Sequence, residues 1–175
     1  LRRPMNHHTN RNPLTAAETR ETMIFVALGS NLGDRARILR SALRQIETTR
    51  TGCILACSRM IETDPVGGPP DQPRYLNAAV ARISSSLEPA ELLNRRLEIE
   101  RAHGRERIGR DHPRTLDLDL LLYGELRIAS EPLTLPHPRM WDRPFVLEPL
   151  AEVCDSAWLN QMRSAALSSG APQGS

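Results

Sequence analysis

The chain has 175 residues, enough for one domain with a substantial core, and its formal net charge is only +2. So small a net charge argues against a nucleic-acid coat protein, and no apolar run approaches the roughly 20 residues that a membrane-spanning helix needs. All 23 basic residues are arginine, which excludes a Walker A loop, a Schiff-base lysine and a protein-kinase lysine. Any phosphate chemistry must therefore use arginine and metal ions.

The N-terminal part of the sequence predicts a polar extension followed by a strand and a helix. Residues 1–21 are polar and aperiodic, which is typical of a disordered extension. The segment 23–30, "MIFVALGS", predicts a buried strand that ends in a glycine turn. The turn itself, "LGSNLGDR" (28–35), could hold an anion at a helix N-terminus or be an ordinary capped turn. Apolar residues at helical spacing predict an amphipathic helix over 33–49.

The central part predicts two further strands, a long loop and a second helix. Residues 52–63 favour a strand, and the loop that follows over 64–75 holds four prolines and two glycines. Loops of this length in a compact domain are often functional. A strand with some alternation is expected over 75–86, and Glu88 and Pro89 open a helix that runs to about residue 103.

The C-terminal part predicts a loop, a strand, a hairpin and a short helix. An arginine-rich loop over 104–113 leads into a strand over 113–124, which a hairpin over 123–130 extends. A proline-rich loop then leads into a short helix within 135–153. The order predicts an α+β fold, a ferredoxin-like β-α-β-β-α-β sandwich with an antiparallel sheet, helices on one face and a C-terminal addition.

This pattern predicts a single domain over 22–165 and a loose tail over 166–175. The three cysteines, Cys53, Cys57 and Cys154, are odd in number and lack the spacing of zinc ligands. We interpret them as reduced thiols of a cytoplasmic protein, since no secretory signal is visible at the start of the sequence. A redox pair of Cys53 and Cys57 is the alternative.

The segment "PRTLDLDLLLYG" (113–124) combines a buried strand pattern with two acidic residues. Successive side chains on a strand alternate between faces, so Leu116, Leu118 and Leu120 share one face and Asp117 and Asp119 share the other. Two carboxylates on one face repel, more so when partly buried. Three outcomes remain open: both aspartates face water, they share a proton as a catalytic dyad, or they hold a cation.

The loop before this strand carries more positive charge than two carboxylates need. Its arginines are Arg105, Arg107, Arg110 and Arg114. Simple ion pairs with the aspartates would use only some of them. Because Mg²⁺ usually combines one or two carboxylates with substrate phosphates, a polyphosphate joined to the aspartates by Mg²⁺ would use both sets of charges. The sequence thus suggests a nucleotide site without a phosphate-binding loop.

A second candidate site involves the few aromatic residues. Tyr75 and Asn77 lie two residues apart on the strand that begins at 75, so they share a face. Aromatic residues form only 3% of the chain, so Tyr75 and Phe145 stand out. They are either core residues or the two sides of an aromatic sandwich around a flat heterocycle, whose edge the Asn77 amide would read.

Four stretches together resemble the 6-hydroxymethyl-7,8-dihydropterin pyrophosphokinase family, enzymes of folate synthesis. They are "ALGSNLGD" (27–34), "DQPRYLNAAV" (71–80), "GRERIGRDHPRTLDLDLLLYG" (104–124) and "LPHPRMWDRPFVLEPL" (135–150). The resemblance implies the ferredoxin-like fold and transfer of the β,γ-pyrophosphoryl group of ATP to the hydroxymethyl group of 6-hydroxymethyl-7,8-dihydropterin, with release of AMP. We further expect a monomer that binds neither nucleic acid nor a membrane.

The resemblance also implies roles for individual residues. Asp117 and Asp119 match the aspartates that hold two Mg²⁺ ions, and Arg105 and Arg114 match arginines that act with them in catalysis. The positions that match pterin contacts are Thr63, Val66, Tyr75, Asn77 and Phe145. The positions that match nucleotide contacts are Glu100, Arg107, Arg110, Arg114, His137 and Arg143. The loops 64–74 and 104–114 would close over bound ATP and exclude water.

This sequence departs from the family pattern at three places. Asp111 and His112 stand where many members have Trp-Gly, so an aromatic lid contact is missing and closure must be weaker or made differently. Pro138 follows His137, where an aromatic residue is common, and Asp64 follows Thr63, where proline is common. Two other functions remain to be weighed: a ferredoxin-like binding module without chemistry, and a metal-dependent phosphohydrolase.

Overall fold

The computed structural model describes residues 21–106, 109 and 111–168, apart from the side chains of residues 78–80. The predictions for residues 1–20 and 169–175, and the positions of Arg107 and Arg110, therefore lie outside the described residues. The described elements, in chain order, are β1 (Thr22–Ser30), α1 (Arg35–Thr48), β2 (Cys53–Cys57), β3 (Met60–Thr63), β4 (Tyr75–Ser85), α2 (Pro89–Ala102), β5 (Asp117–Tyr123), β6 (Ile128–Ser130), β7 (Leu133–Leu135), the 3-10 helix η1 (Met140–Asp142), α3 (Pro144–Val153) and α4 (Ser156–Ser168).

The main sheet has the strand order β2-β4-β1-β5, with β3 also paired to β4, and every one of these pairs is antiparallel. The predicted β-α-β-β-α-β order and antiparallel sheet are confirmed. The predicted strand over 52–63, however, is divided into β2 and β3. At the break the backbone N–H of Arg59 donates to Glu152 Oε2 on α3 at 2.9 Å. This N–H therefore points toward α3 and not toward a neighbouring strand.

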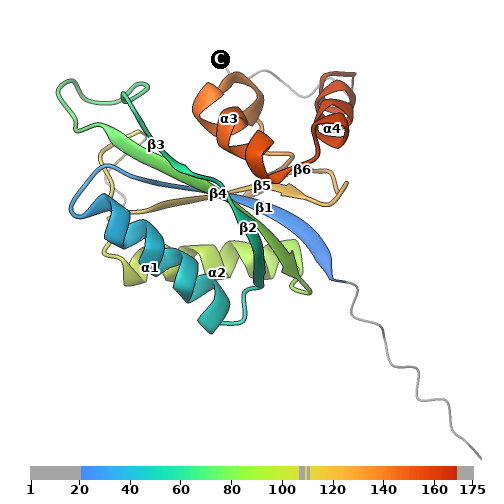
Figure 1. Cartoon of the computed structure of the whole chain (residues 1–175), viewed down its shortest axis with the longest axis horizontal. Coiled ribbons are helices and arrows are strands. Elements are labelled where there is room, and N and C mark those ends of the chain that lie inside the picture. The colour runs from blue at the N-terminus through green and yellow to red at the C-terminus, as the bar shows by residue number, and fades with distance from the viewer. Residues whose placement is uncertain (1–20, 107–108, 110, 169–175) are drawn as a thin grey trace, which may run out of the picture.

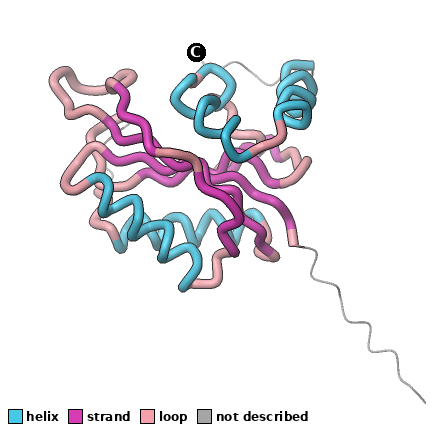
Figure 2. The backbone as a smooth tube through the Cα atoms, in the orientation of Figure 1, coloured by secondary structure: helices cyan, strands magenta, loops and turns pink. Residues whose placement is uncertain are grey.

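Helices cover both faces of this sheet (Figures 1 and 2). The two helices of the predicted sandwich, α1 and α2, pack on one face as expected, over a core that includes Ile24, Leu39 and Leu118. The C-terminal addition, α3 and α4, packs on the other face, over a second core that includes Phe25 and Leu122. The second face thus keeps only part of its area open for a site.

The helix α4 continues to Ser168, so it includes residues 166–168, the first part of the segment that the sequence predicts to be loose. Its apolar side is anchored to the sheet. The Trp158 ring lies 5.7 Å from the Phe25 ring, and Met162 is only 4% exposed. This apolar side supplies the packing free energy that the short, serine-rich segment lacks by itself.

The predicted hairpin that would extend β5 is wrong. Gly124 ends the strand with a φ of +48°, and its N–H donates to the Met23 carbonyl at 2.8 Å. The next strand, β6, pairs with β7 in a separate two-stranded sheet. The strand β5 itself begins at Asp117, four residues later than the predicted start at 113.

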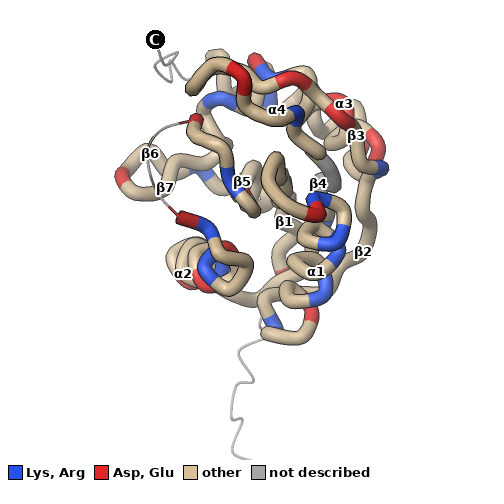
Figure 3. Tube along the Cα trace, turned by 90° about the vertical axis from the view of Figure 1, so that its left-hand side faces the viewer, with Lys and Arg blue, Asp and Glu red and all other residues tan. Residues whose placement is uncertain are grey.

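Charged residues of both signs are spread over the view in Figure 3, in keeping with the small net charge. The helix α1 carries several basic positions, α2 carries residues of both signs, and acidic positions lie on α3. Of the helices that the structure describes, none combines the length and the apolar composition needed to cross a bilayer.

Candidate active site

The strand β5 presents its two aspartates to a pocket on the second face of the sheet. Leu118 and Leu120 are 1% and 6% exposed and belong to the core under α1 and α2. Side chains on a strand alternate, so Asp117 and Asp119 face the other way, as predicted. Both line a pocket of about 250 Å³.

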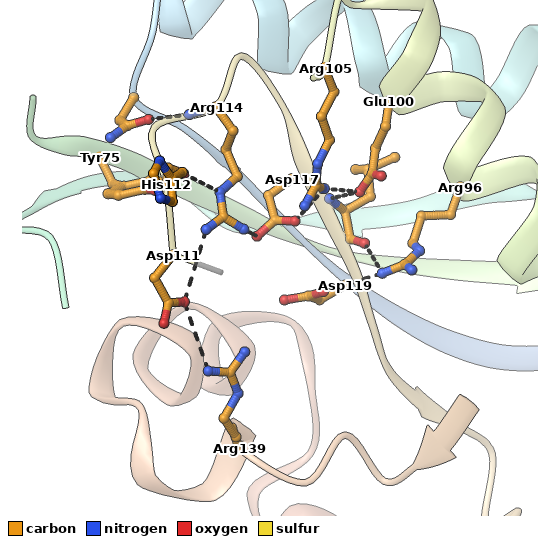
Figure 4. Close-up of polar contacts among 12 residues, drawn as sticks. Tyr75, Arg96, Glu100, Arg105, Asp111, His112, Arg114, Asp117, Asp119 and Arg139 are labelled. Carbon is orange, nitrogen blue, oxygen red and sulfur yellow. Dashed lines mark hydrogen bonds and ion pairs between the residues drawn. The ribbon is translucent and has the colours of Figure 1, made fainter. Parts of the chain in front are cut away.

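Asp117 is held by two arginines from the loop before β5. Arg105 donates to Asp117 Oδ1 at 2.5 Å, and Arg114 donates to Asp117 Oδ2 at 2.9 Å (Figure 4). Burial alone would raise the pKa of the Asp117 carboxyl, but the positive charges of Arg105 and Arg114 outweigh it and hold the pKa below its ordinary value. Asp117 is therefore a carboxylate with its charge compensated.

Asp119 is compensated much less. Its closest cation is Arg96 of α2, whose Nη1 lies 3.3 Å from Asp119 Oδ1, and His137 Nε2 lies 4.0 Å from Oδ2. Burial, and then the negative charge of Asp117, raise the pKa of Asp119 above its ordinary value. Burial likewise lowers the pKa of His137, although Asp119 opposes this. Among the described residues, the Asp119 carboxylate thus has weaker positive partners than Asp117, which two arginines hold at 2.5 and 2.9 Å.

Glu100 of α2 supports the arginine that holds Asp117. It is 1% exposed and accepts a hydrogen bond from the Leu118 backbone N–H at 2.9 Å and a second from Arg105. Burial raises the pKa of Glu100, while these donors stabilise its charged form. Glu100 is not among the lining residues, so it acts on the pocket through Arg105.

The other end of the pocket is mostly uncharged. The Asn77 amide group donates to Thr63 Oγ1 at 2.5 Å, and the Tyr75 hydroxyl donates to the His112 carbonyl at 3.5 Å. Gly29 of β1 pairs with Asn77 in the sheet, and a Cβ at Gly29 would lie 3.0 Å from Asn77 Oδ1. The space beside the Asn77 carbonyl oxygen therefore depends on glycine at this position.

Asn31, just after β1, ties together the loops that border the pocket. Its Nδ2 donates to Gln72 Oε1 at 3.2 Å and to the Pro73 carbonyl at 3.1 Å. Its Oδ1 accepts from the Arg114 backbone N–H at 2.7 Å, and its own backbone N–H donates to the Arg114 carbonyl at 3.1 Å. At 2% exposure, Asn31 is a fully bonded buried amide that positions Arg114.

The pocket brings together ten of the residues that the sequence singled out. They are Thr63, Val66, Tyr75, Asn77, Arg105, Arg114, Asp117, Asp119, Arg143 and Phe145. His137 contacts Asp119 from outside the pocket wall. Sequence reasoning missed several lining residues, namely Gly29, Arg96, Asp111 and Arg139. Arg96 could have been found, because it lies one helical turn before Glu100 and so shares its face of α2.

Asp111 takes a position that the family pattern does not predict. It has a φ of +55°, and its Oδ1 lies 4.0 Å from Arg114 Nη2 and 3.9 Å from Arg139 Nη1. Its carbonyl oxygen lies 3.4 Å from Gln72 Nε2 of the 64–74 loop. An acidic residue here thus links three segments of the pocket wall through polar contacts.

The fold and the pocket define a class: an α+β sandwich whose partly open sheet face carries a pocket lined by aspartates and arginines beside Asn77, Thr63 and Tyr75. The comparisons with known proteins give the family. Residues 25–155 match the 7,8-dihydro-6-hydroxymethylpterin-pyrophosphokinase family, and the chain belongs to it.

Individual relatives agree with this assignment. The chain is 48% identical over 130 residues to a 2-amino-4-hydroxy-6-hydroxymethyldihydropteridine pyrophosphokinase of Bacillus subtilis, covering 74% of this chain and 77% of that protein. It is 43% identical over 129 residues to the protein of the same name from Haemophilus influenzae, covering 74% and 79%. It is also 46% identical over 141 residues to a mitochondrial folate synthesis bifunctional protein of Arabidopsis thaliana, covering 80% of this chain but 25% of that protein.

Proposed function

We propose that this protein transfers the β,γ-pyrophosphoryl group of ATP to the hydroxymethyl group of 6-hydroxymethyl-7,8-dihydropterin. The products are AMP and the dihydropterin diphosphate, an intermediate of folate biosynthesis. Membership of the family supports this activity. The observation that carries it is a single pocket in which paired carboxylates and arginines adjoin a mostly uncharged end built from Asn77, Thr63 and Tyr75.

The uncharged end suits the pterin ring. The Asn77 carbonyl oxygen accepts from an N–H on the ring edge, while its NH₂ group is fixed by Thr63. Tyr75, Phe145 and Val66 offer apolar surface to the faces of the ring. Burial raises the pKa of Tyr75, so its hydroxyl remains neutral beside a neutral ligand.

The charged end suits the triphosphate. Arg105, Arg114 and Arg143 present planar guanidinium groups, which match phosphate oxygens in pairs. Arg143 also lies over the Phe145 ring, 5.6 Å from its centre, so it adjoins both ends of the pocket. His137 would donate a hydrogen bond to a phosphate oxygen near Asp119.

The donor set fits Mg²⁺, and we propose two ions at Asp117 and Asp119. Hard cations prefer carboxylate oxygens, and Mg²⁺ completes its coordination with water and substrate phosphates. Among the described residues no group of three or more acidic, histidine or cysteine side chains forms a cluster that could hold a metal ion. When bound, Mg²⁺ supplies charge neutralisation on the phosphate oxygens and acidifies the pterin hydroxyl.

The transfer is a displacement at the β-phosphorus. The pterin hydroxyl oxygen forms the new bond, the bond from the β-phosphorus to the oxygen bridging the α-phosphate breaks, and AMP leaves with that oxygen. The hydroxyl proton is released. The residues of this chain contribute positioning and electrostatic stabilisation, the main sources of rate in such transfers. Asn77 holds the acceptor, and the arginines align the phosphates.

The direct test mixes the protein with ATP, Mg²⁺ and the hydroxymethyldihydropterin and measures AMP and the pterin diphosphate. We expect one AMP per pterin diphosphate and no AMP without the pterin. A phosphohydrolase would release phosphate or pyrophosphate without pterin, and a binding module would release nothing. Either result rejects the proposal.

Asp117→Ala and Asp119→Ala should each abolish transfer while the fold is kept. Both side chains are partly exposed on the pocket surface, so truncation leaves the leucine core intact. Initial rates of AMP formation and circular dichroism measure the two effects. Asp142→Ala, in η1 and outside the pocket lining, is the matched control. Near-normal transfer by either variant would show that these residues hold no metal.

We also propose that the protein is a cytoplasmic monomer that binds neither nucleic acid nor a membrane. All three cysteines are free thiols in the structure, which suits a reducing compartment. Size-exclusion chromatography with light scattering tests the oligomeric state.

A further inference from the structure

Arg139 lies at the entrance to η1 and lines the pocket, yet neither its sequence position nor the family resemblance pointed to it. Its guanidinium has one ion pair in the described part of the chain, at 3.9 Å to Asp111 Oδ1. The same oxygen lies 4.0 Å from Arg114 Nη2, so two arginines converge on one carboxylate from opposite sides (Figure 4).

The surroundings of Arg139 are unfavourable for a cation without an anion. Arg143 faces the same pocket, and burial followed by the charge of Arg139 lowers the pKa of Arg143. Like charges that line the same pocket repel unless an anion lies between them. Asp111 offers only part of that compensation, since it also serves Arg114 and stands at the edge of the pocket.

The ion pair between Arg139 and Asp111 is weak enough for another anion to replace Asp111. Its side chains are 40% and 30% exposed, and an exposed ion pair at 3.9 Å contributes little. A phosphate oxygen forms shorter, charge-assisted hydrogen bonds with a guanidinium group and can accept two of them at once. A triphosphate that enters the pocket is therefore a better partner for Arg139 than Asp111 is.

We propose that Arg139 is a further phosphate-binding residue of this pocket and that Asp111 is its exchangeable counterion. Arg139 pairs with Asp111 before the nucleotide binds and with a phosphate oxygen afterwards. This inference rests on the proposed function, because it assumes that the pocket receives the triphosphate of ATP. The proposal gives Asp111 a definite role. Its carboxylate holds Arg114 and Arg139 in place before the nucleotide binds, and it competes with the nucleotide for these two arginines.

Because Asp111 and the nucleotide compete for Arg139, substitutions of the two residues should change the Kd of the nucleotide in opposite directions. Arg139→Gln removes a phosphate contact and should raise the Kd of the nucleotide about tenfold. Asp111→Asn removes the competing carboxylate and its repulsion of the phosphates, and should lower the Kd about threefold. In the double variant Asp111→Asn should lower the Kd less than it does alone, since Arg139 is no longer there to be released.

The experiment is a calorimetric titration of each protein with an ATP analogue that has a methylene group between the α- and β-phosphates, in excess Mg²⁺. Arg139→Lys, which keeps the charge, should recover part of the affinity. Arg59→Gln is the matched control, because Arg59 is an exposed arginine with two glutamate partners outside the pocket. The Kd of the pterin alone should be the same in all variants.

The opposite pattern would overturn the inference. If Asp111→Asn raises the Kd as Arg139→Gln does, the pair is a structural link between segments. If Arg139→Gln binds as tightly as Arg59→Gln, Arg139 makes no phosphate contact. In both cases the wild-type protein still binds the analogue and forms AMP, so the proposed function stands. If the wild-type protein does neither, the proposed function fails and this inference fails with it.

Discussion

Two aspartates one strand step apart have opposite electrostatic surroundings in this pocket. Arg105 and Arg114 both bond to Asp117 and lower its pKa, whereas the cationic contacts of Asp119 among the described residues are longer, to Arg96 and His137, and its pKa is raised by burial and by Asp117. The arginines approach from the loop before β5, so they reach the first aspartate and not the second. Two carboxylates on the same strand can therefore differ in how far neighbouring positive charges compensate them.

Cysteine reactivity gives a prediction at the residue scale. Burial, and then the charge of Asp155, raise the pKa of Cys154 to about 11, so only about 0.1% of it is thiolate at pH 8. Cys53 is exposed on β2. We expect iodoacetamide at pH 8 to modify Cys53 early and Cys154 last, as followed by peptide mass spectrometry. Early labelling of Cys154 would contradict the shielded environment described for it.

The loops around the pocket are positioned by a few polar residues at their bases. Asp64, which stands where the family commonly has proline, accepts from Arg74 Nε at 2.8 Å, and Arg74 also pairs with Glu62 of β3. This ion pair closes the base of the 64–74 loop. Where the family commonly has a proline, this chain thus has an ion pair between Asp64 and Arg74.

Asn31 gives a prediction for these loops as elements. Asn31→Ala would leave the Arg114 N–H and the Pro73 carbonyl without their partner, and each unsatisfied buried group costs about 1–3 kcal/mol. We expect a lower melting temperature and faster hydrogen exchange at residues 71–74 and 112–116. Thr49→Ala, which removes hydrogen bonds at the end of α1 far from these loops, is the control. Unchanged exchange at both segments would show that Asn31 does not position them.

Elements whose pattern is local could be predicted from the sequence. The alternation of β5 and the proline at the start of α2 predicted which side chains are buried and where the helix begins. The break between β2 and β3 could not be predicted, because it depends on a hydrogen bond from Arg59 to Glu152, far along the chain. The pairing of β6 with β7 likewise depends on a partner that the hairpin pattern did not specify.

The same distinction applies to the pocket. The motif residues were recognised because they lie in short, distinctive stretches, and the structure gathers ten of them. Asn31, Asp111 and Arg139 lie in the same stretches but were assigned no role in the site, since each acts through a neighbour that folding brings close. The residues next to a position in the sequence do not show which distant residues it will contact in the folded protein.

On the scale of the whole molecule, one sheet separates two cores. The residues of β1 alternate between them, with Ile24 in the core under α1 and α2 and Phe25 in the core under α3 and α4. Both tryptophans, Trp141 and Trp158, belong to the second core or pack against it. The shared strands couple the cores, so we expect them to unfold together.

Leu39→Ala tests this coupling. Leu39 of α1 is fully buried in the first core, so truncation should cost about 3 kcal/mol. Tryptophan fluorescence, which reports the opposite core, should show the same fall in denaturation midpoint as circular dichroism. Leu167→Ala, at an exposed position on α4, should leave both midpoints almost unchanged. Separate midpoints for the two signals would mean that the cores unfold independently.

Gly29 has a consequence for how the pocket accommodates its two substrates, the pterin and the nucleotide. Gly29 pairs with Asn77 on one side and with Asp117 on the other, and a Cβ there would lie 3.0 Å from Asn77 Oδ1, so the depth available to a ring is set by a missing side chain. Enlarging this one position would shut out the acceptor and spare the donor. For a variant that carries a methyl group at this position, an assay of pyrophosphoryl transfer would therefore report a defect that a measurement of ATP binding alone would miss.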